Sequence, residues 1–141
     1  MSSRSERLQP AVEQARQKSE DALTELAAQQ QRVVRAENQL QELERYRTEY
    51  AELGSTVLNV ATLLNRQRFI ARIDRAIVQQ TTEIDRQHRQ LDQVRSHWQF
   101  VHARESARSS VVKGHQERER RAEERLEQSE IDERMQHRRP R

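Results

Sequence analysis

The sequence predicts an all-α protein, a long antiparallel two-helix coiled-coil hairpin whose second helix is longer than its first. Hydrophobic residues make up only 33% of the chain, too few for a globular core of ordinary size. The chain nevertheless has only two Gly and two Pro, and its apolar residues recur at regular intervals. Disordered segments lack such periodicity. We therefore expect helices that pack along one narrow stripe, in a single domain over residues 1–141.

The first helix is expected over residues of about 6–54. Its apolar positions follow steps of four and three residues, which is the spacing of a heptad seam. The seam positions are Leu8, Val12, Ala15, Ser19, Ala22, Leu26, Gln29, Val33, Ala36, Leu40, Leu43, Arg47 and Tyr50. Ten of these thirteen are apolar, and Gly54 with Ser55 supplies the first strong stop signal.

A connection is expected over residues of about 55–64, followed by the second helix over residues of about 65–137. The apolar seam of the second helix uses the same spacing, and only Gln80 and Gln87 interrupt it. Its members are Ile70, Ile73, Ile77, Ile84, Leu91, Val94, Trp98 and Val101. Trp98 is on this seam, so we interpret it as a core residue.

The second helix is expected to extend past the first from about residue 112. A hairpin that turns near Asn59 pairs each residue i with residue 118 − i, which sets Leu8 beside Ser110. Few seam positions are apolar beyond Val101, and a helix without a partner needs no apolar seam.

Several chemical functions are excluded by composition. The chain has no Cys, and a phosphate-binding GxxxxGK loop cannot form with Gly54 and Gly114 alone. None of its five His residues are four apart, the spacing of helical metal sites. A two-helix coil also has no cavity in which to desolvate a carboxylate. We therefore expect no enzymatic activity, no metal and no cofactor.

The expected location is the cytoplasm, because no segment is apolar enough for a signal peptide or a membrane span. A formal net charge of +3 from interleaved acidic and basic residues leaves a nucleic-acid-binding hairpin as a weaker alternative. A homodimeric scaffold is a third possibility. The connection favours a monomer, since it makes pairing of the helices intramolecular.

A second stripe beside the seam of the second helix is a candidate docking surface. It consists of Phe69, Ile73, Ala76 and Gln80. The alternative is that Phe69 folds back over the apolar connection and packs on Val57, Leu58 or Val60. Both interpretations are open at this point.

The chain resembles the flagellar export protein FliJ family over nearly its whole length. The resemblance is carried by Leu40, Leu43, Tyr46, Glu49 and Tyr50 before the connection, by Phe69, Ile70, Ala76, Ile77 and Trp98 on the second helix, and by Gln128, Asp132 and Glu133 near the end. Stalk proteins of virulence-type type III secretion systems share this architecture and are the alternative family.

The resemblance implies a non-enzymatic component of the bacterial flagellar type III protein export apparatus. Family members act as a stalk that inserts into the hexameric export ATPase, promotes its assembly and activity, and couples it to the membrane export gate. They also handle export chaperones. The implied location is peripheral, on the cytoplasmic side of the inner membrane at the flagellar base. Nucleic acids and small molecules are not among the expected partners.

The resemblance also implies two sets of binding residues. Export-gate binding is carried over onto the second stripe, Phe69, Ile73, Ala76 and Gln80. ATPase binding is expected on the extended end of the second helix, at Glu119, Arg125, Gln128, Asp132 and Glu133.

Overall fold

The computed structural model describes residues 3–52 and 59–138 and contains two helices. Helix α1 spans Arg4–Glu52 with 49 residues, and α2 spans Val60–Arg138 with 79 residues. The described part of the chain has no strand. The predicted all-α fold with a longer second helix is therefore confirmed.

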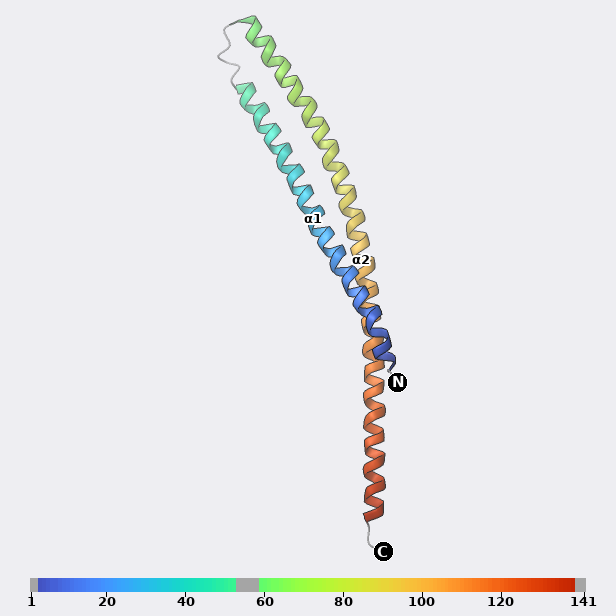
Figure 1. Ribbon diagram of the computed structural model, residues 1–141. Coiled ribbons are helices and arrows are strands. Elements are labelled where there is room, and N and C mark those ends of the chain that lie inside the picture. Colours follow the sequence, from blue (N-terminus) through green and yellow to red (C-terminus); the bar gives the residue numbers. More distant parts are fainter. Residues whose placement is uncertain (1–2, 53–58, 139–141) are drawn as a thin grey trace. The chain divides into compact units, whose positions relative to one another are not determined.

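The helices form two compact units. Unit 1 combines Met1–Asp21 with Gln99–Arg141, and unit 2 is Ala22–Trp98. Within each unit α1 and α2 lie side by side (Figure 1). Contacts in unit 2 join Arg47 to Asp74 and Gln29 to Gln87, so residue numbers rise along one helix as they fall along the other. The pairing is antiparallel, as predicted for a hairpin.

The predicted seam of α1 is the buried face of that helix. All seven seam positions from residue 15 to residue 36 are buried, namely Ala15, Ser19, Ala22, Leu26, Gln29, Val33 and Ala36. In unit 2, Leu26 and Val33 form a core cluster with Leu91, and Val94 and Trp98 pack against it. Trp98 is thus confirmed as a packing residue. The small side chains at the other seam positions allow the partner helix to approach closely.

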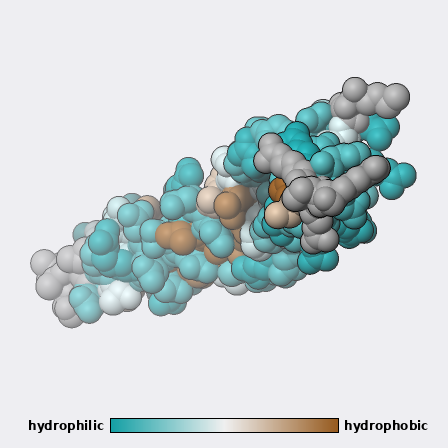
Figure 2. Space-filling view, turned by 90° about the horizontal axis from the view of Figure 1, so that it is seen from below, coloured by the Kyte–Doolittle hydropathy of each residue, from teal (hydrophilic) through white to brown (hydrophobic). Residues whose placement is uncertain are grey.

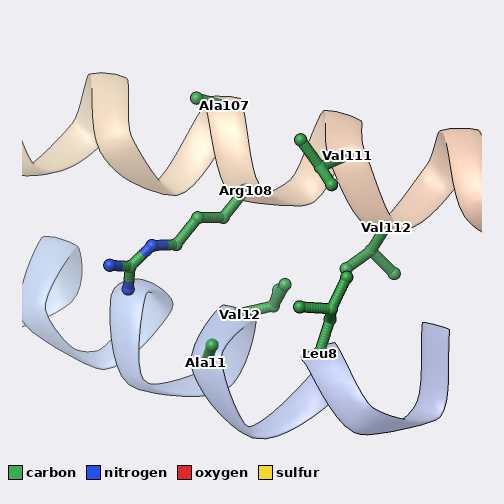
Figure 3. A pocket seen from close by; sticks show the side chains of 7 residues that line it. All are labelled: Leu8, Ala11, Val12, Ala107, Arg108, Val111 and Val112. Atoms are coloured by element: carbon green, nitrogen blue, oxygen red, sulfur yellow. The ribbon is translucent and has the colours of Figure 1, made fainter. Parts of the chain in front are cut away.

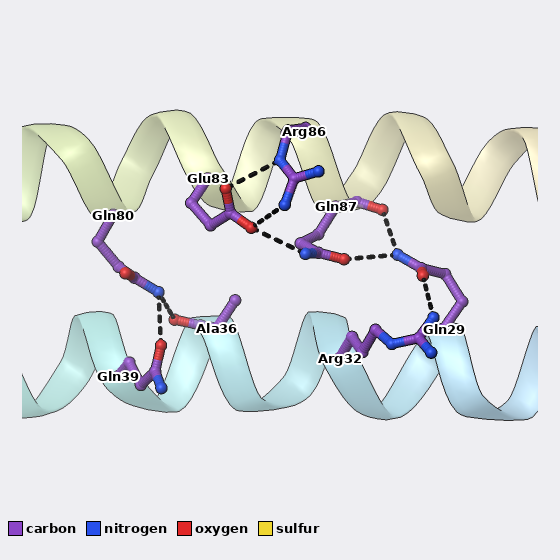
Figure 4. Close-up of polar contacts among 8 residues, drawn as sticks. All are labelled: Gln29, Arg32, Ala36, Gln39, Gln80, Glu83, Arg86 and Gln87. Carbon is purple, nitrogen blue, oxygen red and sulfur yellow. Dashed lines mark hydrogen bonds and ion pairs between the residues drawn. The ribbon is translucent and has the colours of Figure 1, made fainter.

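Two amides cross the helix pair in unit 2 where the apolar seam of α2 is interrupted (Figure 4). Gln29, which is only 2% exposed, donates from Nε2 to the side-chain oxygen of Gln87 at 2.7 Å and to its carbonyl at 3.0 Å. One heptad away, Nε2 of Gln80 donates to the carbonyl of Ala36 at 2.9 Å. Buried amides need partners, so these bonds favour one register of the two helices.

The start of α2 differs from the prediction. The expected connection included residues 60–64, but α2 already begins at Val60. The side chain of Asn59 accepts a hydrogen bond from the backbone N–H of Thr62 at 2.8 Å, which caps the first turn. This cap outweighs the lower helix propensity of the β-branched Val60 and Thr62. The predicted end of the first helix at residue 54 and the connection over 55–58 lie outside the described residues.

The predicted start of the extension, near residue 112, is also wrong. In unit 1 Val112 is only 5% exposed, and Ser5 hydrogen bonds to Glu119. All residues from 120 to 137 are exposed. The helices remain paired for longer than the apolar pattern indicated because polar side chains hydrogen bond across the seam, including Ser19 with His102 at 3.4 Å.

Replacing Gln29 with Ala should lower the free energy of unfolding by about 1–3 kcal/mol, because buried hydrogen bonds and side-chain packing are both lost. Removing Gln87 in the same chain should cost less than the sum of the two single changes. Urea unfolding followed by circular dichroism measures both. Gln30→Ala is the matched control at an exposed neighbouring position and should change stability by less than about 0.5 kcal/mol. Full additivity of the Gln29 and Gln87 changes would contradict a direct interaction.

Candidate interaction surfaces

The described residues present mostly charged and polar surfaces. The face shown in Figure 2 is mostly hydrophilic, with hydrophobic residues in small clusters. Among the described residues, no group of three or more His, Cys, Asp or Glu side chains is placed to hold a metal ion.

Phe69, the first residue of the predicted docking stripe, lies against α1 in unit 2. It is 38% exposed, and its ring centroid is 4.3 Å from that of Tyr50. Beside this pair Arg66 donates to the carbonyls of Tyr50 at 2.6 Å and Ala51 at 2.7 Å. These carbonyls belong to the last turn of α1, where intrahelical donors run out. Arg66 and the aromatic pair therefore fasten the end of α1 to the start of α2.

The alternative environment predicted for Phe69 is only partly described. Val57 and Leu58 lie outside the described residues, and Val60 is 71% exposed. The described contact of Phe69 is with Tyr50, a residue that the sequence placed on the seam of the first helix. Phe69 thus combines a fixed ring with an exposed edge.

The other three stripe residues are less accessible than predicted. Ile73 is 6% exposed and belongs to the helix interface, and Gln80 uses its amide to bond Ala36 and Gln39 of α1. Ala76 is half-buried. The four residues share a face of α2, but that face is turned largely toward α1. Their role in export-gate binding stays a prediction, with Phe69 and Ala76 as the accessible members.

The most exposed apolar residues near the start of α2 were not singled out from the sequence. Val60, Leu63, Leu64 and Val78 are between 42% and 71% exposed. A shallow depression of about 350 Å³ lies beside Val78, lined also by Asp74, Arg75 and Gln79. The signal available in the sequence was the unusually apolar connection, which contains the first three of these residues.

The predicted ATPase-binding residues divide into two groups in unit 1. Arg125, Gln128, Asp132 and Glu133 are all exposed on α2, and Gln128 donates to Asp132 at 3.2 Å. Glu119 instead accepts hydrogen bonds from Ser5, at 2.6 Å from Oγ and 3.2 Å from the backbone N–H. Glu119 therefore holds the two helices together, whereas the other four are free of that constraint.

Hydrogen bonds lower the pKa of two carboxyl groups on α2. The two bonds from Ser5 hold the pKa of the Glu119 carboxyl below its ordinary value of 4.5. The bond from Arg86 does the same for Glu83 and lowers its pKa to about 2. Both carboxyls are ionised at neutral pH, so the Ser5–Glu119 contact is a charge-assisted hydrogen bond.

Replacing Ser5 with Ala should speed amide hydrogen exchange in the first turns of α1 at neutral pH, because the shorter of the two hydrogen bonds to Glu119, the one from the hydroxyl, is lost. The pKa of Glu119 is lowered by folding, so the attachment contributes stability above about pH 4.5 and loses it as the pH falls through the folded-state pKa. The difference from the unmodified chain should therefore shrink in acid. Ser110→Ala, at an exposed position of the same unit, is the control. Equal effects of both changes would contradict the role of Ser5.

Together the described residues define a class of protein, a two-helix hairpin with a narrow core, charged surfaces and a longer second helix whose final turns are exposed. The model of the flagellar FliJ protein family matches residues 4–141, and the chain belongs to this family. It is thus a flagellar export-related protein. Comparison with curated proteins and with solved structures found no match. Neither described helix contains a stretch that is both long enough and apolar enough to cross a membrane.

Proposed function

We propose that this chain is the stalk of the flagellar export ATPase. In this proposal the exposed end of α2, residues 120–137, inserts into the hexameric ATPase ring and promotes its assembly and activity. The supporting observation is that this segment is helical and exposed throughout, in a chain that belongs to the FliJ family.

The charged side chains of this segment suit a helix that must move inside the ring without binding tightly to one subunit. Arg120 bonds Glu117 and Glu124 within the same helix, both at 2.6 Å, so its charge is partly neutralised along α2. Exposed ion pairs of this kind contribute little to affinity. A partner can therefore contact the helix without the deep apolar anchors that produce tight, static binding.

A second functional region is proposed at Phe69 in unit 2, which would bind the cytoplasmic domain of the membrane export gate. Phe69 is held by Tyr50, and an aromatic ring that is already ordered loses little entropy on binding. Handling of export chaperones and a peripheral position at the flagellar base complete the proposal. Both of these follow from the family alone.

The equivalent stalk of a virulence-type secretion system and a nucleic-acid-binding hairpin were the alternatives. The match to the flagellar family favours the first proposal over the virulence-type stalk. The charged side chains argue against nucleic acid, because several Arg side chains pair with acidic residues of the chain, as Arg47 does with Asp74 and Arg86 with Glu83. Arg side chains held in this way are less available for phosphates.

The decisive experiment measures ATP hydrolysis by the flagellar export ATPase with the whole chain or with a chain that ends after Glu119. The shorter chain retains the Ser5–Glu119 attachment and all contacts of unit 2. The whole chain should raise the hydrolysis rate, and the shorter chain should leave it at the basal value. Circular dichroism should confirm that the paired helices of the shorter chain are folded. Equal stimulation by both chains would remove the exposed segment from the proposed mechanism.

Replacing Phe69 with Ala should weaken binding to the cytoplasmic domain of the export gate by about tenfold, the cost typical of a lost aromatic anchor. Isothermal titration calorimetry measures this directly. The matched control is Phe100→Ala, since Phe100 is an exposed aromatic residue of α2 in the other unit, with 59% exposure. Phe69→Ala must also leave ATPase stimulation intact. Loss of gate binding in both variants would show that Phe69 has no dedicated role.

A further inference from the structure

Unit 1 contains an apolar groove between α1 and α2 that the proposed function does not use (Figure 3). It has a volume of about 280 Å³. Its lining residues are Leu8, Ala11, Val12, Ala107, Arg108, Val111 and Val112. Arg108 is the only charged member, and its side chain extends from α2 toward α1. Cavities of about 150 Å³ accommodate a benzene ring, so the groove has room for a whole aliphatic side chain.

An aliphatic side chain suited to this groove lies further along α2. Leu126 is fourteen residues after Val112, which is two heptads, so both residues lie on the same side of the helix. Val112 is buried against α1, whereas Leu126 is 65% exposed. The seam that buries Val112 is therefore continued by an apolar residue that is left in solvent.

Leu126 cannot enter the groove of its own chain. Helix α2 is continuous from Val60 to Arg138. At about 1.5 Å per residue, the fourteen residues from Val112 to Leu126 separate the two by roughly 21 Å along the helix axis. A straight helix cannot fold back over that distance. If Leu126 occupies such a groove, it must be the groove of another molecule.

The spacing of charged residues indicates that this other molecule is a second copy of the same chain. Arg108 precedes Val112 by four residues, and Glu130 follows Leu126 by four residues. When a second α2 runs antiparallel with its Leu126 beside Val112, its Glu130 is set beside Arg108. A two-fold axis near residue 119 repeats both contacts in the other direction. We propose that two copies of this chain associate through their α2 ends, each placing Leu126 and Glu130 in the groove of the other.

This association would make the exposed segment, residues 120–137, less available to other partners. Each copy in the dimer covers the face of α2 that carries Leu126, so the dimer would hold residues 120–137 back from other partners. The contact is small and includes one apolar side chain and one ion pair on each side. Interfaces of this size are weak and transient, so a larger partner can displace the second copy. The inference concerns the isolated chain and does not depend on the proposed function.

Sedimentation equilibrium of the full chain tests this inference. We expect a reversible monomer–dimer equilibrium in the roughly micromolar to millimolar range. Leu126→Glu should abolish the dimer. The matched control is Ile131→Glu, because Ile131 is 49% exposed but is turned about 140° around the helix from Leu126. The control should still dimerise, and circular dichroism should show equal helix content in both variants.

A charge exchange tests the antiparallel alignment. Arg108→Glu and Glu130→Arg should each weaken self-association by about tenfold or more, because like charges then face each other across both contacts. An equimolar mixture of the two variants should restore association, since every contact in the mixed dimer again joins opposite charges. The inference is overturned if the chain remains monomeric up to about 1 mM, if Leu126→Glu and Ile131→Glu act equally, or if the mixture fails to associate.

Discussion

The structure depends on one constraint, which is that two very polar helices must pair along a stripe only one or two side chains wide. A stripe of small residues and a few aliphatic ones brings the helices close but has little power to select a register. The buried Gln29 supplies that selection, since its Nε2 donates to Gln87 of the other helix. Gln80 repeats the constraint one heptad away. Polar residues in this interface therefore determine alignment, and apolar residues provide the attraction.

The same division of roles explains how much of the fold the sequence predicted. The heptad spacing identified the buried face of α1 from Ala15 to Ala36 without error, because burial on a helix follows directly from period. The length of the paired region was underestimated, because the assumed register paired residue i with residue 118 − i, whereas Ser5 bonds Glu119, and because few seam positions beyond Val101 are apolar. Ser5, Ser19 and Glu119 continue the pairing through hydrogen bonds. Periodic polar residues in a heptad frame carry no signal that separates an interface from an exposed face.

The candidate sites were predicted less well than the fold, for a related reason. The spacing of residues gives their angular position around the helix axis. A small rotation of the helix about that axis then decides whether those residues face solvent or the partner helix. Phe69 and Ile73 were assigned to one docking face, yet Phe69 keeps an exposed edge and Ile73 is buried. The contact between Phe69 and Tyr50 joins residues on different helices. Pairwise contacts of this type depend on register, which the spacing of apolar residues within each helix does not specify.

The attachments in the two units illustrate how a narrow interface would serve the proposed stalk. Near the start of α2 the attachment consists of Arg66 on two terminal carbonyls and one aromatic pair, and in unit 1 it consists of Ser5 on Glu119. Each is a small set of polar or aromatic contacts, and such contacts open more easily than a packed core. Beyond Glu119 the heptad frame continues into Leu126 with solvent in place of α1. The seam of α2 thus extends beyond the end of α1. Its uncovered part can pair with a helix from another molecule through the same kinds of contact that pair α1 with α2.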